Sequence, residues 1–258
     1  MGTERYHYAA ITMGDTRGGG GRDFRAYAFQ HALIPGHLTN GASGRWWGYG
    51  GVPGLPFWFE AAHAEWPEAG FDYFLAQMRG PEEKLYYPLF LFQTGPVDPL
   101  KAKPPPAPSG VFPGRGVIML RAEEGPAYWE SPAPAVAMRT ATPYLHKVQD
   151  CFALLGFYAF NRPIYVNHAH ATNYTGVDPG WSNSVRSHSN VIVDFQEPRY
   201  VRESRLRHHF SALAKFAAAR AQGVYPDVDQ TRALVLTREY LLDVFHLRSI
   251  RPRHYYWQ

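Results

Sequence analysis

The stretch WSNSVRSHSNVIVD, residues 181–194, ends in a run that predicts a β-strand. Its branched apolar residues, the type that favours strands, are Val185, Val191, Ile192 and Val193. The run begins, however, with a cation and an imidazole, Arg186 and His188, among small hydroxyl and amide side chains. Such a polar entrance predicts a strand end at which side chains from neighbouring strands converge.

Short strand-like runs separated by turns fill most of the chain beyond residue 116. They cover residues 116–122, 135–141, 151–160, 162–167, 190–195, 232–249 and 253–258. Regular short strands with turn signals are typical of an antiparallel sandwich. The run 213–223 has helical propensity but lies between two strand runs, so helix and strand both stay open for it.

The first 95 residues have a different pattern of apolar residues. Helical spacing of apolar residues occurs at 23–34, 55–66 and 71–79, between loops rich in Gly and Pro. The proline-rich segment TGPVDPLKAKPPPAPSG, residues 94–110, predicts a stiff linker. We therefore expect an α+β fold with a helical segment at 1–95, a linker at 96–110 and an antiparallel β-sandwich at 111–258.

The composition limits the classes of partner. Charged residues make up 19% of the 258 residues and aromatic residues 16%, and aromatic rings suit both core packing and the faces of sugars. The net charge of +4 favours an anionic partner. Because the basic residues are dispersed, nucleic acid is not expected as a partner.

Other compositional features bear on the compartment. Cys151 is the single cysteine and has apolar neighbours, which predicts a buried, inert thiol and no intramolecular disulfide. No apolar run approaches the roughly 20 residues of a membrane span, and the first residues do not resemble a signal peptide. The localisation stays open, and the strand-like end of the chain suggests a fragment of a longer protein.

Three polar clusters flank the strand runs, and they carry the candidate chemistry. The first contains His146, Gln149 and Asp150; the second contains Asn167, His168, His170 and Tyr174; the third contains Arg186 and His188. His168 and His170 share one face at the period of a strand, a spacing that can chelate a metal ion.

These clusters and their spacing resemble the heparinase II/III-like polysaccharide lyases. The run HKVQDCFALLGFYAFNRPIYVN, residues 146–167, is similar to the loop and apolar strand of that family's β-sandwich, and SHSNVIVD, residues 187–194, aligns without a gap with its RSTxxHNTVVVDG-type strand. GRGVIMLRAEE and TRALVLTREYLLDVFHLRS resemble further sandwich segments. MGDTR and GLPFWFEAAHAEW look like the last hairpins of the family's α/α toroid, which implies a partial toroid before the sandwich.

The resemblance implies β-elimination on a polysaccharide that contains uronic acid. The carboxylate must be neutralised before a base can remove the C5 proton, and an acid protonates the departing O4 oxygen. His146, Tyr174 and Arg186 are the catalytic candidates, and Asp150 and Trp181 are the substrate-binding candidates. The implied partner is an anionic polysaccharide or oligosaccharide.

The resemblance also implies a structural Zn²⁺ held by His, Asp and His. His188 matches one ligand, Asn167 stands at the position of the Asp, and Val148 stands at the position of the other His. Because valine cannot bind metal, zinc would need a replacement ligand such as His168 or His170.

Two other interpretations of the sequence stay open. One is a non-catalytic carbohydrate-binding or structural sandwich derived from a lyase, which the substitutions at Val148 and Asn167 favour. Arg186 has a structural alternative too, because it could pair with Asp150 or Asp194. Glycoside hydrolysis would need a close pair of carboxylates, and the clusters do not offer a convincing one.

Overall fold

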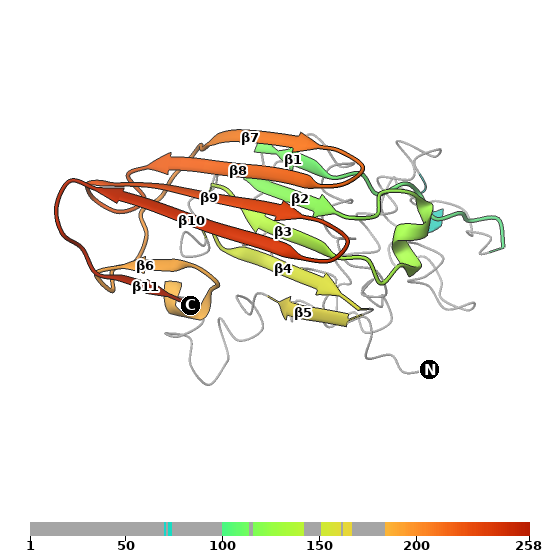
Figure 1. The fold of residues 1–258 in the computed structure, drawn as a ribbon, viewed down its shortest axis with the longest axis horizontal. Coiled ribbons are helices and arrows are strands. Elements are labelled where there is room, and N and C mark those ends of the chain that lie inside the picture. Colours follow the sequence, from blue (N-terminus) through green and yellow to red (C-terminus); the bar gives the residue numbers. More distant parts are fainter. Residues whose placement is uncertain are drawn as a thin grey trace, which may run out of the picture. The chain divides into compact units, whose positions relative to one another are not determined.

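The structure is a computed structural model of the chain, and it describes residues 70, 72–73, 100–113, 116–141, 151–160, 162–166 and 184–258. This part of the chain is built mainly of antiparallel strands (Figure 1). Its short 3₁₀ turns include η6, Pro126–Glu130, and η8, Val185–Ser187. None of the helices in the described residues is long and apolar enough to cross a membrane.

The expected α+β fold class is wrong for the part of the chain that can be described. Strands make up 46% of it, and it holds no helix of seven residues or more. Of the expected helical segment at 1–95, only residues 70 and 72–73 are described, with Asp72 and Tyr73 helical. The other helical runs lie outside the described residues. The physical reason for the correction is that the described strands from Gly110 onward satisfy their backbone groups by lateral pairing with neighbouring strands.

The first sheet is a five-stranded antiparallel meander. Its strands, in spatial order, are β1 Gly110–Phe112, β2 Val117–Arg121, β3 Ala135–Arg139, β4 Leu154–Ala159 and β5 Arg162–Val166. β2 and β3 are buried on both faces, which explains why their sequences are nearly continuous apolar runs. The expected strands at 116–122, 135–141, 151–160 and 162–167 are thereby confirmed.

The second sheet is a four-stranded antiparallel meander. Its strands are β7 Arg205–Phe210, β8 Lys215–Gln222, β9 Val228–Leu236 and β10 Leu241–Ser249. β8 resolves the ambiguity at 213–223 in favour of a strand. Alternate alanines on it, Ala217, Ala219 and Ala221, are buried, so burial at period two outweighs the helical propensity of alanine.

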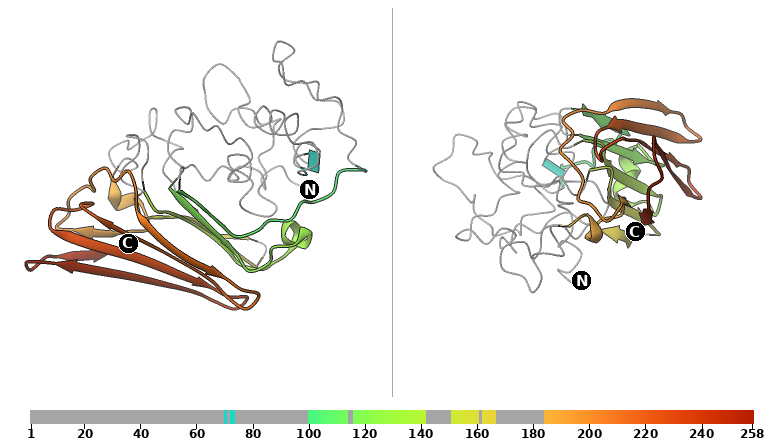
Figure 2. Two further views of the ribbon diagram at one scale, coloured as in Figure 1. Left: turned by 90° about the horizontal axis from the view of Figure 1, so that it is seen from above. Right: turned by 90° about the vertical axis from the view of Figure 1, so that its left-hand side faces the viewer.

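The inner faces of the two sheets share one hydrophobic core, in which Ile118, Leu120 and Met138 of the first sheet cluster with Leu234 and Leu236 of the second. The sheets therefore form two layers of a sandwich (Figure 2). A two-stranded ribbon, β6 Val191–Val193 with β11 Tyr255–Trp257, lies beside β10. β6 belongs to the segment 184–197, which also contains Arg186 and His188 of the third polar cluster.

Candidate functional site

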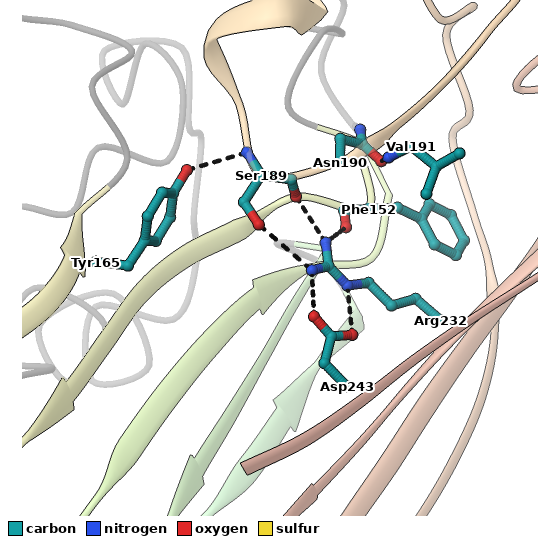
Figure 3. Close-up of polar contacts among 7 residues, drawn as sticks. All are labelled: Phe152, Tyr165, Ser189, Asn190, Val191, Arg232 and Asp243. Carbon is teal, nitrogen blue, oxygen red and sulfur yellow. Dashed lines mark hydrogen bonds and ion pairs between the residues drawn. The ribbon is translucent and has the colours of Figure 1, made fainter. Parts of the chain in front are cut away.

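The residue Ser189 joins three strands at the entrance to β6 (Figure 3). Its backbone N–H donates to the hydroxyl of Tyr165 on β5 at 3.1 Å. Its carbonyl accepts from the backbone N–H of Leu154, where β4 begins, at 3.3 Å, and from the guanidinium of Arg232 on β9 at 2.7 Å. The entrance to β6 is thus tied to both sheets.

The next residue, Asn190, makes a second link to the start of β4. Its side chain is buried, and Nδ2 donates to the carbonyl of Cys151 at 2.6 Å. Its Oδ1 accepts from the backbone N–H of Val191 at 2.8 Å. One side chain therefore satisfies backbone groups of two segments that lie 39 residues apart. The Cys151 side chain is fully buried, as its apolar neighbours predicted.

These bonds bring together the flanks of all three polar clusters. Cys151 directly follows the first cluster, Val166 directly precedes the second, and residues 186–188 are the third. β4 and β5 are paired, and both contact Ser189. The sequence prediction named further residues of these clusters, and they lie outside the described residues: His146, Asp150, Asn167, His168, Tyr174 and Trp181.

A buried arginine that the sequence argument missed holds this region together. Arg232 is completely buried, and its guanidinium makes five hydrogen bonds (Figure 3). Two go to the carboxylate of Asp243 on β10, at 2.9 and 2.5 Å. The others go to the carbonyl of Phe152 at 2.5 Å and to the carbonyl and hydroxyl of Ser189 at 2.7 and 3.5 Å. All five donors of the group are used.

The surroundings of Arg232 complete a rigid support. The guanidinium carbon lies 5.2 Å from the ring centroid of Phe245 and 5.8 Å from that of Trp257, both within cation–π range. Phe152 adopts a positive φ of 65°, and its carbonyl accepts one of the guanidinium hydrogen bonds. The sequence did hold a signal: Arg232 is in phase with Leu234 and Leu236, so alternation places a charge on the core face.

Arg186, the catalytic candidate that is described, lies in η8 and is exposed. Its turn is fixed by Ser184, whose Oγ accepts from the backbone N–H of Arg186 at 3.3 Å. Glu197 accepts from Ser184 Oγ at 2.6 Å and from the backbone N–H of Val185 at 2.8 Å. The Arg186 guanidinium carbon lies 5.7 Å from the ring centroid of Phe195. The turn therefore presents a cation to solvent on a fixed backbone.

Asp194 does not serve as a counter-ion for Arg186, because other groups hold it. Its Oδ1 accepts from the backbone N–H of His254 at 2.9 Å, and its Oδ2 accepts from Arg253 Nη1 at 2.6 Å. The hydrogen bond from His254, followed by that from Arg253, lowers the pKa of the Asp194 carboxyl below its ordinary value. The structural alternative of an Arg186–Asp194 pair is therefore overturned, whereas a pair with Asp150 involves a residue outside the described part.

His188 is the one proposed zinc ligand that can be placed. It is buried, with 1% of its surface exposed, and its backbone N–H donates to the carbonyl of Val185. Within the described ranges, no three His, Cys, Asp or Glu side chains lie together as a metal site. The other candidate ligands, Asn167, His168 and His170, lie outside the described residues.

Comparison with models of known families and with curated proteins finds no match for this chain.

Proposed function

We propose that this chain is a polysaccharide lyase of the heparinase II/III-like kind, or part of one, and that it cleaves uronic-acid polysaccharide by β-elimination. The observation that supports the proposal is the convergence on Ser189 and Asn190. The hydrogen bonds there join the start of β4, the strand β5 and the entrance to β6. Each of these segments borders one of the three polar clusters in the sequence, and we propose that the clusters supply the groups for charge neutralisation and proton transfer.

The proposed reaction assigns a task to each candidate. Arg186, a permanent cation with planar paired donors, neutralises the uronate carboxylate and so acidifies the C5 proton. A base takes this proton, the electron pair forms the C4–C5 double bond, and the C4–O4 bond breaks. An acid protonates O4 as it leaves. His146 and Tyr174 are the candidates for the two proton transfers, and Asp150 and Trp181 are candidates for holding the sugar. Arg232 is a positioning residue, since protein groups use all five of its guanidinium donors.

The test is incubation with alginate, heparan sulfate, hyaluronan and glucuronan while the ultraviolet absorbance of the unsaturated product is followed. We expect an increase on one of these polymers. His146→Ala, Tyr174→Phe and Arg186→Gln should each slow it by at least about 100-fold, the scale of one positioned acid–base or electrostatic group. Arg202→Gln, which removes an exposed arginine elsewhere, is the matched control and should keep the wild-type rate.

The second candidate function is carbohydrate binding without catalysis. The specific observations that favour it are Val148 and Asn167, which stand where the lyase pattern has metal ligands. The same experiment separates the two functions. Saturable binding of a uronate polymer with no rise in absorbance on any substrate contradicts the lyase and supports the binding protein.

A further inference from the structure

We infer that Arg186, Phe195 and Tyr256 form a subsite for a single uronate residue, with the guanidinium binding its carboxylate and the aromatic pair contacting its ring. The inference rests on the proposed function for its substrate class. It goes further by assigning binding roles to Phe195 and Tyr256, which were not among the sequence candidates.

The three side chains come from separate segments and form one stack. Phe195 follows β6, Tyr256 lies in β11, and Arg186 lies in η8. The ring centroids of Phe195 and Tyr256 are 3.7 Å apart with an interplanar angle of 33°. The Arg186 guanidinium carbon is 5.7 Å from the Phe195 centroid. Yet 51% of the Phe195 surface is exposed, so the stack does not bury the ring as a core residue would be buried.

The backbone that presents Phe195 is strained. Asp194 and Phe195 have consecutive positive φ angles of 52° and 56°, a conformation that suits glycine and is unfavourable for a bulky side chain. Asp194 is clamped by the backbone N–H of His254 and by Arg253, which is itself mostly buried and also donates to the carbonyl of Pro226. A strained backbone that neighbouring contacts hold in place, and that presents an exposed aromatic ring, is typical of functional positions.

The chemistry of the stack matches a uronate. Aromatic rings pack against the C–H faces of sugars, and the Tyr256 hydroxyl adds a hydrogen-bonding group. Arginine binds a carboxylate with two parallel hydrogen bonds. Arg186 has no carboxylate partner among the described residues, and its contact with Phe195 pre-orients the guanidinium, which lowers the cost of binding. A neutral sugar would use the rings alone, so the subsite should discriminate by charge.

The test compares the binding of hexasaccharides of glucuronate and of mannuronate with that of their carboxyl-reduced, neutral counterparts, by titration calorimetry on the full chain. The wild type should bind one acidic oligomer about tenfold or more tightly than its neutral counterpart, as expected for a charged hydrogen-bonded pair. Arg186→Gln should abolish that preference. Arg202→Gln and Tyr240→Ala, which alter exposed side chains outside the stack, are matched controls and should leave it unchanged.

The decisive variant is Phe195→Gly, because binding and structural roles predict opposite results. If Phe195 is present for binding, glycine relieves the positive φ, so the Tm stays or rises by a few degrees while the acidic oligomer binds about tenfold more weakly. A lower Tm with an unchanged Kd would show that the ring only supports the turn and would overturn the inference. Binding of none of the hexasaccharides by the wild type would overturn it as well.

The outcomes also separate this inference from the proposed function. Carboxylate-dependent binding that is lost in both variants, without cleavage of any polymer, supports the subsite and contradicts elimination. Cleavage with an unchanged KM in Arg186→Gln and Phe195→Gly supports elimination and contradicts the subsite.

Discussion

Replacing Arg232 with methionine tests whether this buried cation supports the candidate site. Methionine keeps much of the side-chain length but removes all five hydrogen bonds of the guanidinium. The carbonyls of Phe152 and Ser189 then lose a donor in the interior, and the carboxylate of Asp243 loses its ion-pair partner. The site should therefore lose stability and order together.

The magnitude follows from what is left unpaired. Removing one partner of a buried ion pair costs about 3–5 kcal/mol. Asp243 keeps 18% of its side-chain surface exposed, so water can solvate part of its charge, and we expect a loss of about 4 kcal/mol. Arg232→Met combined with Asp243→Leu should be about 2 kcal/mol less destabilised, because the unpaired carboxylate is gone while the two carbonyls still lack a donor.

The assay is equilibrium urea denaturation, with hydrogen exchange at the amides of Leu154 and Ser189 as a local readout. The amide of Leu154 donates to Ser189 and that of Ser189 to Tyr165, so both should exchange faster in Arg232→Met. A loss below about 1 kcal/mol would refute the reasoning, because the hydrogen bonds of the cation would then contribute little to stability. A double variant less stable than Arg232→Met would refute it as well, because the carboxylate of Asp243 would then not be destabilising when it is unpaired.

Three further perturbations probe the surrounding contacts. Asn190→Ala should cost about 2 kcal/mol in urea denaturation, because the buried carbonyl of Cys151 loses its donor; a cost below about 0.5 kcal/mol would contradict the bond. Tyr165→Phe should cost about 1 kcal/mol and speed exchange at the Ser189 amide, which loses its acceptor, whereas unchanged exchange there would contradict it. In the folded protein the pKa of Asp194 is below its ordinary value of 3.8. The Asp194 carboxylate therefore makes its full contribution to the free energy of unfolding above pH 3.8, and this contribution is lost as the pH falls from there toward the lower folded pKa. In a series of melting temperatures measured at different pH values, the wild type should therefore lose stability over that acid range, and Asp194→Asn should lose less. An identical fall in Tm for the two proteins would contradict the lowered pKa of Asp194.

Much of the sandwich was predictable because its strands follow simple patterns. β2, β3 and β4 are continuous apolar runs, and β6 is short and branched. β7 was missed because residues 205–210 are mostly polar and exposed, so apolar alternation is absent at this edge of the sheet.

The run 232–249 was predicted as one strand-like segment, whereas it forms two strands of a hairpin. Thr237 makes the turn, since its Oγ1 accepts from the backbone N–H groups of Glu239 and Tyr240. The polar residues at 237–239 were the available signal for this turn.

The candidate site was predictable only in part. The polar residues before β6 correctly indicated a place where strand ends meet. The change from polar to apolar residues marks where this strand begins. The contacts that join these strand ends link residues 24 to 43 positions apart in the sequence, such as Ser189 with Tyr165 and with Arg232. The local sequence does not reveal which distant residues will face one another. The exposed stack of Phe195 and Tyr256 was likewise invisible, because it depends on a positive φ and on the pairing of β6 with β11.

The most direct test of the proposed elimination is the mass of the product formed in water enriched in heavy oxygen. Elimination breaks the C4–O4 bond without adding water, so the account predicts an unsaturated oligosaccharide that carries no solvent oxygen. A saturated product that has taken up heavy oxygen would demonstrate hydrolysis and contradict the account, as would the absence of any product from every uronate polymer.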